Sequence, residues 1–357
     1  MKIGIITWHN YPNVGSALQA YALHTFINRN GGDATIINYS PFGRPSLWLF
    51  RLIASFFDKL LPKKLSSKLH YRFISFEHKY FRETKLYKDN RDLKKNVEQF
   101  DIFVCGSDQI WAPNVFNDVY MLSFVPDNKI KVSYAASIGL PEIPEKLIPT
   151  YKALLNRFDN ISVRERQGAD LLYSSLGINS TVVLDPTLLL KKEDWLKIGN
   201  NKKNRKPYVL CYFLGEQESH RKIVESFAKS KNYDVICISR YSIDIRINFI
   251  TDTDVGPREF IDYVRFAEYV FTDSFHGLCF SVNFNKNFFV LKRFTEDSPI
   301  NQNSRIENIL SLLGLENQLI SETPQSVENI DYNLVNKRLE KLRDNSHQYL
   351  REALHIK

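Results

Sequence analysis

Apolar runs that end in polar clusters alternate with helical patterns along most of this chain. The first unit is an apolar run at 2–8, a polar loop at 9–16, a helical pattern at 17–28 and a second apolar run at 33–39. A strand, a helix and a strand in this order predict a βαβ unit and a parallel sheet. Ligands bind beyond the carboxyl ends of such strands, so the polar clusters are candidate site residues.

The pattern repeats on both sides of a short hydrophilic stretch, 199–206, which has no hydrophobic residue and is the best linker candidate. Further strand patterns lie at 100–105, 131–135, 160–163 and 180–184 before it, and at 208–214, 234–239, 270–272 and 288–291 after it. At about 150 residues per domain, 357 residues suggest two domains. We therefore expect an α/β protein with two Rossmann-like, doubly wound domains, 1–200 and 207–330, facing a cleft. A helical pattern at 331–357 is expected to pack back on the first domain.

Charge is distributed unevenly along the chain. The formal charge is +8, yet residues 44–95 carry fourteen Lys and Arg against five Asp and Glu, so this segment is +9 and the remainder is −1. One basic segment on a near-neutral body argues against a protein that wraps nucleic acid and favours a local anionic partner. Residues 47–61 within it (LWLFRLIASFFDKLL) are amphipathic, which fits either a helix at a membrane surface or an ordinary core helix.

The cysteine pattern and the hydropathy indicate the cellular compartment in which the protein is expected. Cys105, Cys211 and Cys237 lie in apolar strand patterns, as expected of buried free thiols in a reducing compartment, and no cysteine spacing fits a zinc site. No signal peptide opens the chain, and no apolar run reaches about 18 residues. We expect a cytoplasmic protein without a metal site, with peripheral contact to the inner face of the membrane through the basic segment.

Two polar clusters belong to the first predicted domain. The loop at 9–16 precedes a helix whose N-terminal N–H groups would favour an anion, and Asn10, Asn13 and Ser16 add polar side chains. An ordinary βα turn explains the same pattern. In the second cluster, GSDQIW at 106–111, Asp108 could accept a proton or orient a substrate hydroxyl, or it could simply cap a helix.

A pair of arginines follows the strand pattern at 160–163. Alternation along a continuing strand would send Arg164 and Arg166 to the same face, and guanidinium groups suit carboxylates and phosphates. Surface ion pairs with Glu165 or Asp170 are the alternative.

The sequence TDSFHG at 272–277 is the most suggestive cluster. It places His276 between a strand and a helix, where an imidazole lies near the helix dipole and can donate or accept protons. Asp273 and Ser274 provide a polar surround. The chain has no GxSxG pattern, which argues against a serine hydrolase.

Taken in order, these motifs resemble the polysaccharide pyruvyltransferase family. The similar segments are Asn13–Leu23 (NVGSALQAYAL), Cys105–Trp111 (CGSDQIW), Ser162–Arg166 (SVRER), Leu184–Leu190 (LDPTLLL) and Thr272–Gly277 (TDSFHG), with Lys292–Phe294 and Ser304–Ile306 beyond them. GSDQIW and SFHG are the specific motifs, whereas residues 41–96 match none. The resemblance implies a fold similar to the glycosyltransferase-B architecture. It also implies transfer of the enolpyruvyl group of phosphoenolpyruvate onto two hydroxyls of a sugar, which gives a cyclic ketal and phosphate without a metal or organic cofactor.

The resemblance also implies roles for individual residues. His276 would be the general acid or a phosphate contact, and Asp108 the base or the group that orients the acceptor. Arg164 would hold the carboxylate or phosphate of the donor. Arg293, Arg305 and Ser274 complete the predicted donor side, with Asp273 and Ser274 holding the histidine, and Asn10, Asn13 and Ser16 line the acceptor side. Asp185 is expected to organise the turn at Pro186 rather than touch substrate.

Two alternatives concern the substrates. Gly215 and Glu216 follow a predicted strand and could serve a nucleotide diphosphate, so a nucleotide-sugar glycosyltransferase on the same fold is the alternative activity. The amphipathic pattern at 47–61 beside basic residues predicts a lipid-linked sugar acceptor of capsular or exopolysaccharide biosynthesis, held at an anionic membrane. No zinc-finger, RRM or KH pattern occurs, so no nucleic-acid partner is expected.

Overall fold

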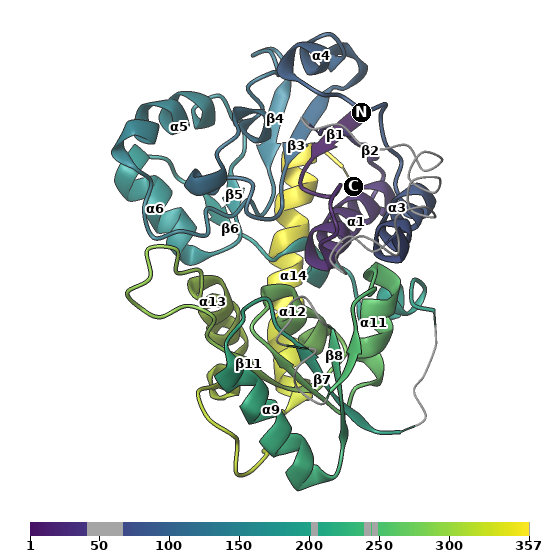
Figure 1. Ribbon diagram of the computed structural model, residues 1–357. Coiled ribbons are helices and arrows are strands. Elements are labelled where there is room, and N and C mark those ends of the chain that lie inside the picture. Colours follow the sequence, from purple (N-terminus) through teal and green to yellow (C-terminus); the bar gives the residue numbers. More distant parts are fainter. Residues whose placement is uncertain (41–66, 201–205, 239–243, 245–248, 357) are drawn as a thin grey trace.

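The computed structural model describes residues 1–40, 67–200, 206–238, 244 and 249–356 (Figure 1). The chain forms two α/β units, one above the other in Figure 1, each built on a parallel sheet. The predicted α/β class with two Rossmann-like units is therefore confirmed. Most of the predicted linker lies outside the described residues.

The first unit contains a four-stranded sheet in the order β2-β1-β3-β4. Its strands are β1 (Lys2–Ile6), β2 (Asp33–Ile36), β3 (Ile102–Cys105) and β4 (Ile130–Ser133). A short parallel pair, β5 (Ser162–Val163) and β6 (Thr181–Val182), continues the layer through single bridges next to β4. The strand order reverses between β1 and β3, so a crevice opens at their carboxyl ends.

The second unit contains a six-stranded parallel sheet in the order β12-β11-β10-β7-β8-β9. Its strands are β7 (Tyr208–Tyr212), β8 (Asp234–Ile238), β9 (Ile250–Asp252), β10 (Tyr269–Thr272), β11 (Asn287–Leu291) and β12 (Leu319–Ile320). Counted from β7, this is the Rossmann order 3-2-1-4-5-6. Its reversal lies between β7 and β10, so this unit has a crevice of its own at the ends of these two strands.

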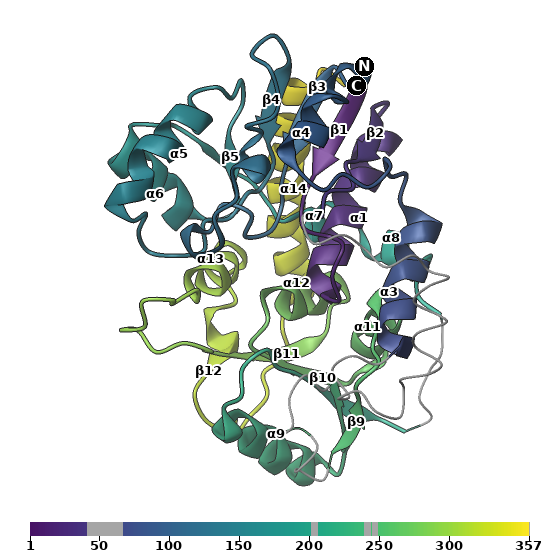
Figure 2. The ribbon, with the colours of Figure 1, turned by 45° about the horizontal axis from the view of Figure 1, so that its top comes forward.

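Helices cover these sheets and fill the space between the two units (Figures 1 and 2). In the first unit they are α1 (Val14–Arg29), α3 (Ser67–Tyr80), α4 (Asn90–Lys94), α5 (Ile148–Leu155), α6 (Arg166–Leu176), α7 (Pro186–Leu189) and α8 (Lys192–Leu196). In the second they are α9 (Glu218–Lys231), α11 (Pro257–Phe266), α12 (Phe275–Asn283) and α13 (Ser304–Leu313), and α14 (Tyr332–Leu354) ends the chain.

The largest hydrophobic core crosses the boundary between the units. It contains buried side chains from α1, α7 and α8 of the first unit and from α11 and α12 of the second. Trp195 of α8 illustrates the contact, because its ring lies 4.7 Å from that of Phe280 in α12 and 5.7 Å from that of Tyr21 in α1. A continuous apolar core fixes the relative position of the units, and so of residues at their junction.

Helix α14 runs along both units and bonds to each (Figures 1 and 2). Near its middle, the buried Arg343 donates to the carbonyl oxygen of Leu188 (2.6 Å) and to the side-chain oxygen of Asn283 (2.8 Å), which joins α7 to α12. Near its end, the hydroxyl of Tyr349 donates to the carbonyl oxygen of Ser133 in the first sheet (2.9 Å). The C-terminal helix therefore packs on the first unit while it connects the two.

The described part of the basic segment, 67–95, also connects the units. Helix α3 buries Leu69, Phe73 and Phe76 in the shared core, and its Arg72 lies 3.5 Å from Glu259 of α11. Helix α3 is therefore a core helix, and its Lys68 also lies near an acidic residue, 3.7 Å from Asp254. The amphipathic stretch 47–61, for which a membrane helix is the open prediction, lies outside the described residues.

All four cysteines are free and buried. Within the described ranges, no helix has the length and apolar content needed to cross a bilayer.

Candidate active site

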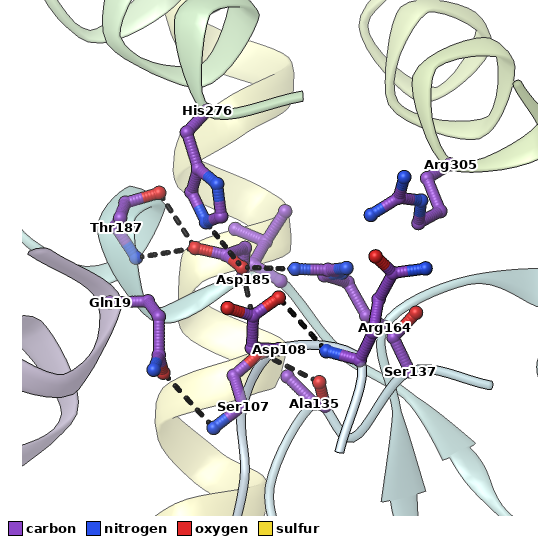
Figure 3. Close-up of polar contacts among 12 residues, drawn as sticks. Gln19, Ser107, Asp108, Ala135, Ser137, Arg164, Asp185, Thr187, His276 and Arg305 are labelled. Carbon is purple, nitrogen blue, oxygen red and sulfur yellow. Dashed lines mark hydrogen bonds and ion pairs between the residues drawn. The ribbon is translucent and has the colours of Figure 1, made fainter. Parts of the chain in front are cut away.

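Side chains from both units converge at the junction between the units (Figure 3). His276 of α12 and Arg305 of α13 point from the second unit toward Asp108, Arg164 and Asp185 of the first. The motifs predicted to contribute the site are therefore brought together from positions more than a hundred residues apart.

Asp185 is the hub of this cluster. One carboxylate oxygen, Oδ2, lies 2.9 Å from Nη1 of Arg164 and 3.6 Å from Nε2 of His276. The other, Oδ1, accepts the backbone N–H and the hydroxyl of Thr187, at 2.9 and 2.7 Å. Burial alone would raise the pKa of the Asp185 carboxyl, but His276, Arg164 and the Thr187 N–H outweigh it and hold that pKa well below its usual range. Asp185 thus ties a cation of the first unit to the imidazole of the second.

Arg164 presents an incompletely paired guanidinium in a dry environment. The residue is 3% exposed, its guanidinium stacks 4.4 Å from the centre of the Phe275 ring, and its Nε lies 3.7 Å from Glu165. Among the described residues, its Nε and Nη2 make no hydrogen bond. Burial acts to lower the pKa of Arg164, but Asp185, Glu165 and Asp108 overcome it and raise that pKa. A buried, permanently charged fork with unused donors suits a carboxylate or phosphate ligand.

Arg305 adds a second buried cation beside Arg164 (Figure 3). Its guanidinium donates to the side chain and the carbonyl of Gln302, at 2.8 and 3.3 Å. Burial, followed by repulsion from Arg164 and Arg293, lowers the pKa of Arg305 to about 9. Cations that repel each other in a buried place are stabilised by an anion between them.

Arg293 belongs to the edge of this cluster. Its guanidinium lies 4.9 Å from the centre of the Phe294 ring, and its carbonyl oxygen accepts the side-chain amide of Gln217 at 2.5 Å. Within the part of the chain that the structure describes, its buried Nε has no hydrogen-bond partner. Arg293 is therefore close enough to add to the field at Arg305 and has a donor to spare.

Gly15, near the start of α1, packs directly against the ring of His276. A Cβ atom at this glycine would lie 2.0 Å from Nδ1 of His276, closer than any side chain tolerates. The first turn of α1 and the first turn of α12, which contains His276, thus approach each other. Both helix N-termini lie at the junction, where their dipoles favour negative charge.

Asp108 is held by local bonds at the end of β3. Its backbone is left-handed (φ 70°), Oδ1 accepts the N–H of Gln109 at 2.9 Å, and Oδ2 accepts the hydroxyl of Ser16 at 2.5 Å. The hydroxyl of Tyr11 lies 2.7 Å from that of Ser16. Asp108 is therefore joined to the loop at 9–16 by a chain of hydroxyl groups.

Asp273 and Ser274 do not hold the histidine side chain, so that expectation is wrong. The Ser274 hydroxyl accepts the N–H of Gly277 at 3.3 Å and caps α12. The Asp273 carboxylate accepts the N–H groups of Leu214 and Gly215, at 2.6 and 2.8 Å. Both residues position the β10–α12 turn, because a short polar side chain satisfies the nearest unpaired backbone donors first.

Three other predicted residues shape the surroundings. Asn13 caps α1 through the N–H of Ser16 (3.2 Å), and Asn10 donates to the carbonyl oxygen of Tyr39 (2.7 Å). Arg166 is exposed, and the predicted strand alternation does not relate it to Arg164, because β5 ends at Val163 and Arg166 is the first residue of α6.

Three residues of the candidate site were not predicted from the sequence, namely Asp185, Phe275 and Gly15. Asp185 does cap the turn at Pro186, as expected, but only with Oδ1. The signal available in the sequence was its position shortly after a strand, three residues beyond the end of β6 at Val182. Among the described residues, no group of three or more His, Cys, Asp or Glu side chains is arranged to hold a metal ion.

The family profile described as polysaccharide pyruvyl transferase matches residues 13–293, which include Asp108, Arg164, Asp185, His276 and Arg293 of this cluster. This match covers most of the chain, and the protein belongs to that family. No curated protein matches the sequence significantly.

Solved structures are similar in fold at low sequence identity. The UDP-GlcNAc 2-epimerase of Neisseria meningitidis bound to UDP-GlcNAc has a TM-score of 0.56 at 10% identity, over 99% of each chain. MnaA of S. aureus in a co-structure with UDP has a TM-score of 0.52 at 14% identity, over 99% of this chain and 91% of that one. An alpha-glucosyltransferase in complex with UDP has a TM-score of 0.50 at 11% identity, over 98% of this chain and 96% of that one. These likenesses show the two-domain glycosyltransferase-B fold.

Proposed function

We propose that this protein transfers the enolpyruvyl group of phosphoenolpyruvate onto two hydroxyls of a sugar, which yields a cyclic pyruvate ketal and phosphate. The observation that carries the proposal is the buried pair Arg164 and Arg305, with unused donors on Arg164, next to His276 and across from Asp108. Phosphoenolpyruvate has a carboxylate and a phosphate on three carbons, so two guanidinium forks at one place suit it.

The chemistry assigns a role to each side chain. Arg164 and Arg305 bind the two anionic groups of the donor, with Arg293 at the edge. His276, next to the Asp185 carboxylate, protonates C3 of the enolpyruvyl group, which leaves positive charge at C2. An acceptor hydroxyl attacks C2 while Asp108 removes its proton. The C–O bond to phosphate then breaks, and the second hydroxyl closes the ketal. No step requires a metal or an organic cofactor.

The nucleotide-sugar alternative has less support. A diphosphate in a Rossmann sheet uses the backbone N–H groups after the first strand, which here is β7. In this chain Asp273 occupies the N–H groups of Leu214 and Gly215, and Arg221 donates to the Gly215 carbonyl oxygen (2.6 Å). A nucleotide diphosphate would have to displace a buried carboxylate from this place.

For the acceptor, we propose a lipid-linked sugar of cell-surface polysaccharide biosynthesis. The motivating observation is the sequence at 47–61, where aromatic and aliphatic residues stand within the basic segment. Co-sedimentation with anionic vesicles is the test, with neutral vesicles as the control. Equal recovery with both kinds of vesicle would remove the membrane from the proposal.

The test of the activity is phosphate release from phosphoenolpyruvate in the presence of a panel of lipid-linked galactosyl, mannosyl and amino-sugar acceptors. Release that requires both substrates is the expected result. UDP- and GDP-sugars replace phosphoenolpyruvate in parallel reactions. Turnover with a nucleotide sugar, and none with phosphoenolpyruvate, would favour the alternative.

A further inference from the structure

The hydroxyl chain from Asp108 to Tyr11 carries an inference that rests on the proposed function. Asp108 is 6% exposed and Ser16 is 1% exposed, whereas Tyr11 is 38% exposed. The three side chains are linked in series, with 2.5 Å between Asp108 Oδ2 and Ser16 Oγ and 2.7 Å between Ser16 Oγ and Tyr11 Oη. A continuous hydrogen-bonded path therefore leads from a buried carboxylate to the surface.

The direction of these bonds follows from the number of protons. An ionised carboxylate only accepts, so the one hydroxyl proton of Ser16 points at Asp108. The Ser16 oxygen then accepts from Tyr11, whose phenol is the donor. The Ser16 hydroxyl therefore donates once and accepts once, and the chain points toward the ionised carboxylate. When Asp108 is protonated, both hydroxyl groups can rotate so that each donates outward, and a proton can then pass from Asp108 toward the surface.

The proposed reaction gives such a path a use. Ketal formation removes a proton from each of two acceptor hydroxyls; one proton is added to C3 and the other ends on the released phosphate, so the reaction frees no net proton. Asp108 must still lose the proton that it accepts before the next turnover, and His276 must regain the proton that it donates. Asp108 is enclosed, so its proton needs a route, and the chain through Ser16 and Tyr11 is the route that the described hydrogen bonds provide.

We propose that Tyr11 and Ser16 form a proton relay that returns Asp108 to its ionised form in each turnover. The protonated Asp108 passes its proton to the oxygen of Ser16, Ser16 passes its own hydroxyl proton to the oxygen of Tyr11, and Tyr11 releases its phenol proton to water or to a buffer base. Both hydroxyls begin and end the cycle protonated, and the proton that leaves through them is balanced by the proton that His276 regains. Tyr11 acts through Ser16 and is a positioning and relay residue rather than a catalytic one.

Tyr11→Phe isolates the relay. This variant keeps a ring that can pack edge-on against Trp8, now at 6.3 Å, and loses only the hydroxyl. Tyr39→Phe is the matched control, because Tyr39 belongs to the same aromatic cluster but its hydroxyl accepts from Asn117 instead. We expect kcat of Tyr11→Phe to fall about tenfold, less than the loss of a full acid or base, with little change in the KM for phosphoenolpyruvate.

Rescue by a small buffer base distinguishes a relay from a structural role. In phosphate-release assays, kcat of Tyr11→Phe should rise with imidazole concentration at constant pH and ionic strength, whereas the unmodified protein and Tyr39→Phe should not respond. A normal kcat for Tyr11→Phe, or a reduced kcat that imidazole leaves unchanged, would overturn the relay. Absence of phosphate release from the unmodified protein with every acceptor would instead contradict the proposed function.

Discussion

The two units present the same topological feature, a crevice at a strand-order reversal, and they use it in opposite ways. In the first unit, the crevice between β1 and β3 contains Asp108, whose carboxylate is bonded to a hydroxyl chain and faces the junction. In the second, the crevice between β7 and β10 contains Asp273, whose carboxylate is bonded to the chain's own backbone N–H groups. The carboxylate of Asp108 is thus directed to the junction between the units, whereas that of Asp273 occupies the backbone N–H groups of its own crevice.

In the proposed function, this difference explains how a nucleotide-binding topology serves another donor. The second unit contributes to the candidate site through the first turn of the helix after β10 and through α13, which supply His276 and Arg305. The proposed donor site therefore lies at the junction between the units rather than in the crevice of the second unit. The variants below test the two halves of this comparison.

The largest expected effect is at the junction itself. His276→Ala should lower kcat for phosphate release by about 10²–10⁴-fold, the usual contribution of a positioned acid or base, because no other imidazole of the described chain meets Asp185. Thermal unfolding should change little. Near-normal turnover would remove His276 from the mechanism.

Gly15→Ala tests the contact between the two helix starts. Alanine is favoured over glycine inside a helix by about 1 kcal/mol, so α1 should not be destabilised on its own account. The new methyl group would displace the His276 ring, and kcat should fall about a hundredfold, within the range for a misplaced catalytic group. Circular dichroism and thermal unfolding provide the control. Unchanged activity would mean that the position of the ring is not critical.

Arg305→Met separates function from stability. Replacing a buried charge with an apolar side chain of similar volume is often neutral or stabilising, by about 1–4 kcal/mol, and here it also removes the repulsion from Arg164. We expect phosphoenolpyruvate to raise the Tm of the unmodified protein, and we expect Arg305→Met to have an unchanged or higher Tm without ligand and to lose this increase. A variant that phosphoenolpyruvate still stabilises fully would exclude Arg305 from the donor site.

The smallest expected effect concerns the crevice between β7 and β10, where Asp273 occupies the backbone N–H groups. Asp273→Asn replaces a carboxylate that accepts two N–H groups with an amide that has a single acceptor oxygen, which should cost about 1–3 kcal/mol of unfolding free energy. The KM for phosphoenolpyruvate should change far less than in Arg305→Met. A large rise in this KM, or stabilisation of the unmodified protein by UDP, would contradict the distinction between the crevices.

Much of the fold could be predicted, because buried parallel strands are visible in the sequence as apolar runs, and the ends of these strands are visible as polar clusters. The site was predictable where one motif contains its own chemistry, as with His276 in TDSFHG and Asp108 in GSDQIW. It was not predictable where a role depends on a distant partner. Gly15 is explained only by a ring 261 residues further along the chain.

Aspartates were the least predictable residues. Asp185 and Asp273 both follow a strand and precede a helix, so their local sequences predict the same capping role. In Asp185, one carboxylate oxygen accepts a hydrogen bond within its own turn and the other contacts Arg164 and His276. In Asp273, both carboxylate oxygens accept backbone N–H groups that follow β7. Such a division follows from tertiary packing, which local sequence does not record.

The central claim is that the junction binds phosphoenolpyruvate and transfers its three-carbon unit. The most direct measurement is mass spectrometry of the lipid-linked acceptor after incubation with isotopically labelled phosphoenolpyruvate. The account predicts that the labelled three-carbon unit appears on the sugar as a ketal, together with one phosphate for each transfer. An acceptor that gains a sugar from a nucleotide sugar, and never the labelled unit, would contradict it.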